Sequence, residues 1–168
     1  MSEFKFPTEV IDLPSKGLLY PKDSPLASGK LEMKYMTARE EDILTSQNLI
    51  KQGVVIDKLM QSMIISPINY NDIIVGDKNA MMVACRILGY GKDYSTEENC
   101  PNCKAKQQVN IDLSDLPEYS VPEDLKSVAP GVFEFILPQS KRTVHFKLLS
   151  VNDDKNITKE LEANKKSN

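Results

Sequence analysis

The stretch MMVACRILGYGKDYSTEEN, residues 81–99, decides the fold class, because the repeat of its apolar side chains changes within it. Before Gly91 the apolar residues recur at the spacing of one helix face, namely Met81, Ala84, Cys85 and Leu88. From residue 94 onward apolar and polar residues alternate, which is typical of strands. The sequence therefore predicts an α+β fold, with helices before this point and antiparallel strands after it.

The chain divides into four segments on either side of Gly91. We expect an extended arm with short strands, a small helical core of about three helices, a β module with a Cys-Pro-Asn-Cys turn, and a polar tail. In order, these segments cover residues 1–36, 37–91, 92–151 and 152–168. The β module is expected to resemble a degenerate zinc ribbon, that is, a ribbon that has kept one of its two cysteine turns.

Three helices are signalled in the core. Thr37 and Glu40 have the spacing of a capping box and begin a helix over residues 36–53. A second helix is expected over residues 54–65, where the apolar side chains recur every four residues. For the third, residues 69–91, we expect Asp77 to be the N-cap and a glycine to mark the end.

The arm is broken up by proline and glycine, so a helix is not expected there. Residues 15–20 (SKGLLY) and 29–36 (GKLEMKYM) are predicted as short strands. The arm also carries an apolar cluster that either packs on the chain's own core or binds a partner. Its members, our candidates for partner contact, are Leu13, Leu18, Leu19 and Tyr20.

The β module contains three runs that read as strands, at residues 107–113, 133–138 and 142–151. The proline-rich segment 114–131 between the first two is expected to be a loop. Only a short helical tendency, over residues 157–166, is visible in the tail.

The stretch ENCPNCKAK, residues 98–106, places Cys100 and Cys103 at the spacing of one zinc knuckle. A structural zinc ion usually has four ligands from two such turns. The remaining soft side chains are Cys85, which belongs to a helix stripe, and His145, which belongs to a strand. We therefore expect less than one equivalent of zinc, while Cys100 and Cys103 stay candidate metal ligands. A thioredoxin-like redox role is not favoured, because a strand and not a helix follows the turn.

Composition excludes several classes of protein. The net charge is −3 and no segment is strongly basic, which disfavours nucleic-acid binding. Three cysteines argue against a disulfide framework and fit a reducing cytoplasm. The first 17 residues lack the pattern of a signal peptide, and no apolar run is long enough to span a membrane.

No catalytic constellation is recognisable, so we expect a protein that is not an enzyme. The sequence has a single histidine, so His145 would have to be the base of any histidine-based catalytic triad. Residues 89–94 (GYGKDY) lack the glycine spacing and the hydroxyl residue of a phosphate-binding loop.

Several short motifs occur in one order along the chain. They are DLPSKGLLYP (12–21), MTAREEDILTS (36–46), VIDKLM (55–60), CRILGYGKDY (85–94), CPNC (100–103) and VNIDLS (109–114). Their order and spacing resemble the baseplate hub family of T4-like contractile-tailed bacteriophages, which includes hub subunits and hub assembly factors. The resemblance covers roughly residues 10–150.

The resemblance implies a non-enzymatic late protein that builds the central hub of the baseplate in the host cytoplasm. It implies other hub proteins as partners, leaves a homo-oligomer open, and is compatible with retention in the virion tail. Members of this family are usually longer, so we expect the natural chain to extend beyond residue 168. Two alternatives remain: a cytoplasmic chaperone of another tail protein, such as the tape measure, and a zinc-ribbon accessory protein for nucleic acid.

Overall fold

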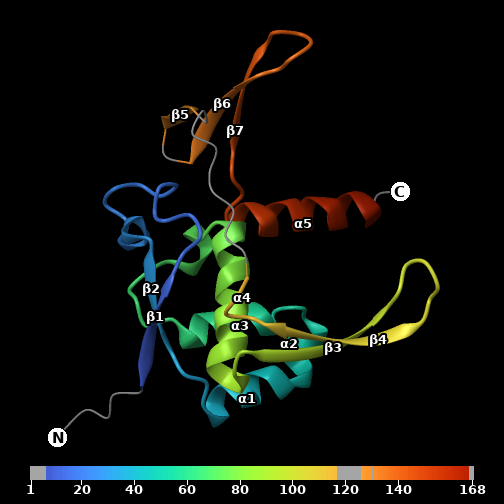
Figure 1. Ribbon diagram of the computed structural model, residues 1–168. Helices are drawn as coiled ribbons and strands as arrows, with labels where there is room; N and C mark the ends of the chain where they lie inside the picture. Colours follow the sequence, from blue (N-terminus) through green and yellow to red (C-terminus); the bar gives the residue numbers. More distant parts are fainter. Residues whose placement is uncertain (1–6, 117–125, 130, 167–168) are drawn as a thin grey trace, which may run out of the picture.

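The structure, a computed structural model, describes residues 7–116, 126–129 and 131–166. It confirms the α+β class, with helices at the centre and small antiparallel sheets around them (Figure 1). The elements in chain order are β1 (Thr8–Asp12), η1 (Pro25–Ser28), β2 (Lys30–Lys34), α1 (Ala38–Thr45), α2 (Gln47–Lys51), α3 (Val55–Met63), η2 (Tyr70–Asp72), α4 (Val75–Tyr90), β3 (Asp93–Asn99), β4 (Lys106–Asp112), β5 (Lys126–Ala129), β6 (Val132–Ile136), β7 (Thr143–Lys147) and α5 (Val151–Lys166).

The helical core is built around α3, which packs against both α1 and α4. Its apolar stripe meets the predicted inward face of α4, where Met81, Cys85 and Leu88 are buried. Met60 and Met63 are fully buried beside them and fill the core, whereas Met82 is 42% exposed.

The helix predicted over residues 36–53 is interrupted, so that α1 and α2 are separate. Ser46 lies between them with an extended backbone (φ −67°, ψ 106°) and caps both helices. The predicted capping box at the start of α1 is confirmed, because Thr37 and Glu40 exchange both of its hydrogen bonds.

Glu40 also joins three elements inside the protein. Its fully buried carboxylate forms an ion pair with Lys34 of β2 at 2.7 Å and accepts a hydrogen bond from Ser62 of α3. Burial alone would raise the pKa of Glu40, but the contacts with Lys34, Ser62 and Thr37 outweigh burial and lower it to about 2.

The arm forms a hairpin in which β1 and β2 pair from Thr8↔Lys34 to Asp12↔Lys30. Residues 29–36 contain the predicted strand, but residues 15–20 form a turn and not a strand. Gly17 explains the difference: its φ is +76°, and a Cβ atom there would lie 2.2 Å from the Ala27 carbonyl oxygen. Only glycine fits this turn without strain.

A buried carboxylate fastens the arm to α4. Asp77 accepts hydrogen bonds from the Ser15 backbone N–H at 3.0 Å, from the Ser15 hydroxyl at 2.7 Å and from the Tyr20 hydroxyl at 2.6 Å. The Tyr20 oxygen in turn accepts from the Ile74 backbone N–H. The prediction that Asp77 caps α4 is wrong: the N-cap is Ile74, and the Asp77 carboxylate is used by the arm instead.

The residues predicted as one β module form two sheets that are not hydrogen-bonded to each other. β3 and β4 pair from Asp93↔Asp112 to Asn99↔Lys106 and make a hairpin that extends away from the helices (Figure 1). β5, β6 and β7 form a three-stranded sheet, in which β5 falls within the predicted loop 114–131. The rest of that loop lies partly outside the described residues.

The tail forms the helix α5, which is longer than the helical tendency predicted from the sequence. Val151 at its start is fully buried, and its backbone N–H donates to the Ile73 carbonyl oxygen at 2.8 Å. Asp153 accepts hydrogen bonds from the backbone and hydroxyl of Ser150 and so closes the first turn.

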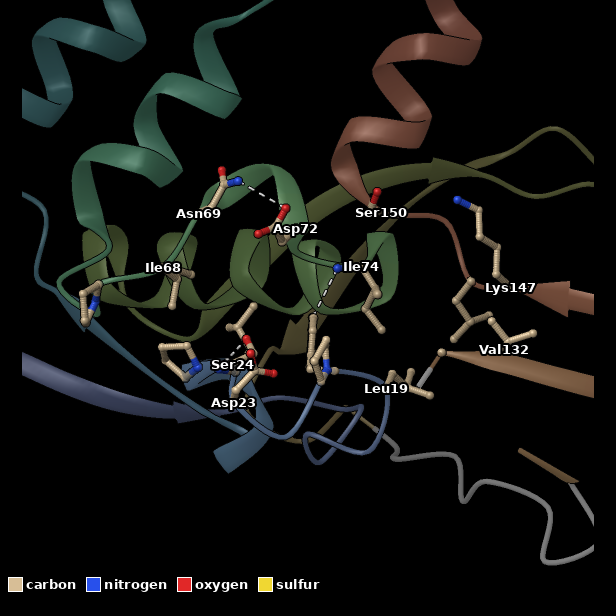
Figure 2. A pocket seen from close by; sticks show the side chains of 17 residues that line it. Leu19, Asp23, Ser24, Ile68, Asn69, Asp72, Ile74, Val132, Lys147 and Ser150 are labelled. Atoms are coloured by element: carbon tan, nitrogen blue, oxygen red, sulfur yellow. Dashed lines mark hydrogen bonds between the residues drawn. The ribbon is translucent and has the colours of Figure 1, made fainter. Parts of the chain in front are cut away.

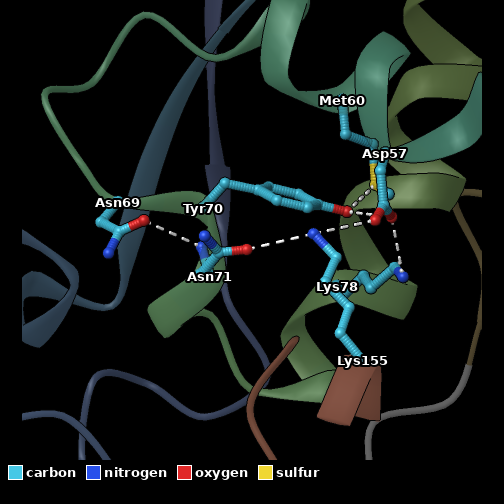
Figure 3. A network of polar contacts seen from close by, with 7 residues as sticks. All are labelled: Asp57, Met60, Asn69, Tyr70, Asn71, Lys78 and Lys155. Atoms are coloured by element: carbon cyan, nitrogen blue, oxygen red, sulfur yellow. Dashed lines mark hydrogen bonds and ion pairs between the residues drawn. The ribbon is translucent and has the colours of Figure 1, made fainter. Parts of the chain in front are cut away.

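A second polar network holds α5 against the core (Figure 3). Asp57 of α3 accepts a hydrogen bond from the Tyr70 hydroxyl at 2.8 Å and pairs with Lys78 at 3.0 Å and with Lys155 of α5 at 3.2 Å. Lys155 also reaches the Asn71 side-chain oxygen. Burial would raise the pKa of Asp57, but these partners lower it.

We predict that Asp77→Ala lowers the free energy of unfolding by about 3 kcal/mol, because it leaves the buried hydroxyls of Ser15 and Tyr20 without their charged acceptor. The matched control is Asp72→Ala, which removes an exposed carboxylate with one hydrogen bond and should change the same quantity by less than about 0.5 kcal/mol. Urea unfolding measures both. Equal stability of the two variants would contradict the anchoring role of Asp77.

We also predict an acid-labile contribution from Glu40. Its pKa in the folded protein is about 2, below the ordinary value of 4.5, so its stabilisation is complete above about pH 4.5 and is lost as the pH falls toward 2. Glu40→Gln should therefore flatten the dependence of the unfolding free energy on pH over this window, whereas Glu41→Gln at the exposed neighbouring position should leave it unchanged. Urea unfolding curves recorded at several pH values between 2 and 7 would show the difference.

Candidate functional site

The structure separates the four arm residues proposed for partner contact into two pairs. Leu13 and Tyr20 are buried in the chain's own core, next to Leu26 and Leu31. Leu18 points outward and is 70% exposed, while Leu19 is partly buried against the core. Surface for a partner is therefore available at Leu18 and, in part, at Leu19.

Leu19 borders a groove of about 480 Å³ that lies between the arm, residues 67–74 and the three-stranded sheet (Figure 2). The sheet contributes Val132 and Lys147 to its wall, and Ile68 and Ile74 contribute apolar surface on another side. The backbone of the arm comes close to the sheet here, since a Cβ atom on Gly131 would lie 3.1 Å from the Leu19 carbonyl oxygen. The groove thus joins the accessible part of the arm to the sheet.

The three-stranded sheet has one apolar face. β6 pairs with β7 so that Phe133 lies opposite Phe146 and Phe135 lies opposite Val144, which places all four side chains on the same face. The rings of Phe133 and Phe146 pack with their centroids 5.5 Å apart. Phe133 is buried, but Phe135 is 51% and Phe146 is 41% exposed. Exposed aromatic side chains that gather on one sheet face are typical of protein–protein contact surfaces.

The opposite face of the sheet is polar at its centre. Glu134 lies opposite His145, and the His145 Nε2 atom is 3.5 Å from the Glu134 carboxylate. Lys147 on this face pairs with Asp153 at the start of α5 at 2.7 Å. The sheet is therefore amphipathic, and both faces keep accessible side chains: Phe135 and Phe146 on the apolar face, and His145 and Lys147 on the opposite one.

The predicted metal ligands Cys100 and Cys103 lie in the turn between β3 and β4. The turn is closed by two backbone hydrogen bonds of 2.9 Å, from Cys100 N–H to the Ala105 oxygen and from Lys104 N–H to the Cys100 oxygen. The backbone N–H groups of Cys103 and Asn102 also donate to the Cys100 thiol, and these hydrogen bonds lower its pKa. Cys103 is exposed and Cys100 is half-buried.

The other two side chains that could act as soft metal ligands, Cys85 and His145, belong to different elements. Cys85 is buried in α4, where burial raises the pKa of its thiol to about 12. His145 lies on β7 beside Glu134. Within residues 7–116, 126–129 and 131–166 there is no group of three or more histidine, cysteine or acidic side chains arranged to hold a metal ion.

Two accessible surfaces were not singled out from the sequence. The exposure of Phe135 and Phe146 depends on how the sheet packs, and the apolar sequence of β6 (VFEFI) does not indicate which of its side chains stay exposed. On α5, Ile157 and Leu161 are one helical turn apart and both are exposed. Their spacing in the sequence indicates an apolar stripe on one helix face, but the tail is otherwise so polar that this stripe is easily overlooked.

None of the helices in the described part of the chain has the length and apolar character of a membrane-spanning segment. No curated protein and no solved structure matches the chain. The family described as T4 bacteriophage base plate protein matches residues 9–164, which include the arm, the helical core, both β sheets that follow it and most of α5. The chain therefore belongs to the T4 bacteriophage base plate protein family.

Proposed function

We propose that this protein is a non-enzymatic component or assembly factor of the central hub of the baseplate, and that it acts by binding other tail proteins. Membership of the baseplate family supports the tail role. The order of motifs from residue 12 to residue 114 supports the hub in particular. Assembly would take place in the cytoplasm of the infected cell.

The observation that carries a binding role is the accessible apolar face of the three-stranded sheet. Phe135 and Phe146 expose aromatic surface there, and Leu148 and Leu149 continue the exposed apolar surface along the chain. Burying a large apolar side chain in an interface is worth about 1.5–3 kcal/mol. A partner that covered this face would therefore gain binding energy from each of the exposed aromatic rings.

The non-enzymatic part of the proposal is supported by the roles of the titratable groups. Perturbed pKa values often mark active sites, but structural networks perturb them as well. Glu40, Asp57 and Tyr20 have shifted pKa values, and each of them joins segments that are distant in the sequence. Their shifts are therefore explained by packing.

We predict that Phe135→Asp blocks baseplate assembly while the melting temperature of the isolated protein stays within a few degrees of the wild type. The side chain is half exposed, so its replacement removes partner contact more than core packing. Thr143→Asp is the matched control, because it adds the same charge to the same sheet on the opposite face. Phage yield and electron microscopy of tails measure assembly, and thermal unfolding measures stability. Normal assembly by the Phe135→Asp phage would contradict the binding role of this face.

The arm offers a parallel test. We expect Leu18→Asp to leave stability nearly unchanged, whereas Leu13→Ala at the buried position should lower the free energy of unfolding by about 2–5 kcal/mol. If Leu18→Asp nevertheless reduces phage yield, Leu18 belongs to the partner interface; normal yield would remove Leu18 from it.

Mass spectrometry of purified virions, beside lysate of infected cells, tests whether the protein is a hub component. Finding it in virions at a constant ratio to other baseplate proteins supports a component of the hub. Finding it in lysate alone supports an assembly factor, and its recovery there in complex with the tape measure would favour the chaperone alternative instead.

A further inference from the structure

The turn between β3 and β4 presents two thiols at the end of a projecting hairpin. β3 and β4 pair along seven residues each and extend away from the helices, so the turn lies far from the body of the protein (Figure 1). Cys103 is exposed at this end and Cys100 is half-buried. The two thiols are therefore accessible to another molecule while the helices and the other sheets remain at a distance.

The turn keeps the two thiols close together. Lys104 has a left-handed backbone (φ 61°), which lets the chain reverse its direction within the turn. The backbone of Cys100 is hydrogen-bonded to Ala105 and to Lys104 on the other side of this reversal. The Cys100 sulfur accepts N–H groups of Asn102 and Cys103, and the Cys103 thiol lies within hydrogen-bonding reach of it. Two sulfur atoms held together in this way form a ready pair of ligands for a soft metal ion.

The chain supplies only half of the ligands that such an ion requires. Zinc in structural sites is held by four tetrahedral ligands. The sequence contains three cysteines and one histidine; Cys85 is buried in α4, and His145 belongs to another sheet. A four-thiolate site formed by residues 1–168 therefore takes its two additional thiolates from another molecule.

We propose that a second copy of this chain completes the site, so that one Zn²⁺ ion joins two hairpin ends through Cys100 and Cys103 of each copy. The four thiols lose their protons to solvent when the metal binds. A zinc ion with four thiolates carries net negative charge, and Lys104 of each copy places positive charge next to it. Because the hairpin projects, two ends can meet without contact between the two bodies. This inference does not depend on the role in the hub.

The test is a titration of the reduced 168-residue chain with zinc and, in parallel, with cobalt. We expect saturation at one metal ion per two chains, a doubling of the mass measured by light scattering, and a return to the original mass on addition of a chelator. The cobalt form should show the visible absorption of a tetrahedral four-thiolate site. Cys100→Ser and Cys103→Ser should each abolish metal binding and the doubling of mass, while Cys85→Ala should retain both.

The serine variants are expected to stay folded, because the turn lies at the exposed end of the hairpin. A circular dichroism spectrum equal to that of the wild type is the control for folding. The proposal is overturned if the wild-type chain binds one zinc ion per monomer without a change of mass, or if it stays monomeric and metal-free at saturating zinc. It is equally overturned if the zinc-dependent doubling persists in the Cys100→Ser and Cys103→Ser variants.

Discussion

The hydrogen bonds between Asp77 and the arm determine how this protein is organised. A carboxylate enclosed in the core must be fully hydrogen-bonded, because an unpaired charge there would be very costly. Ser15 and Tyr20 provide the donors, and Tyr20 also accepts from the start of α4. This arrangement fixes the turn around Gly17, which in turn buries Leu13 and leaves Leu18 facing outward.

Two further carboxylates connect β2 and the helices in the same manner. Glu40 joins β2, α1 and α3, and Asp57 joins α3, α4 and α5. The apolar core is rich in methionine and aliphatic side chains, whose packing alone specifies geometry weakly. Buried polar contacts with defined partners can supply the specificity that such a core lacks.

Local signals predicted the helices of the core well and the strands only in part. The capping box at Thr37, the stripe along α3 and the change of period at Gly91 depend on neighbours in the sequence, and the structure agrees with each of them. The role of Asp77 could not be predicted in this way, because its partners are about sixty residues away. The burial of Leu13, the exposure of Leu18 and the exposure of Phe135 could not be predicted for the same reason. All three depend on tertiary packing.

The separation between Ser15 and Asp77, 62 positions along the chain, has a consequence for folding during synthesis. The arm leaves the ribosome before α4, so the carboxylate that holds it appears only when α4 has been made. Contacts between distant segments form slowly, because the intervening chain must lose entropy before the contact is gained. We therefore expect Leu13 and Tyr20 to become buried only after α4 has been made, although they are translated before it.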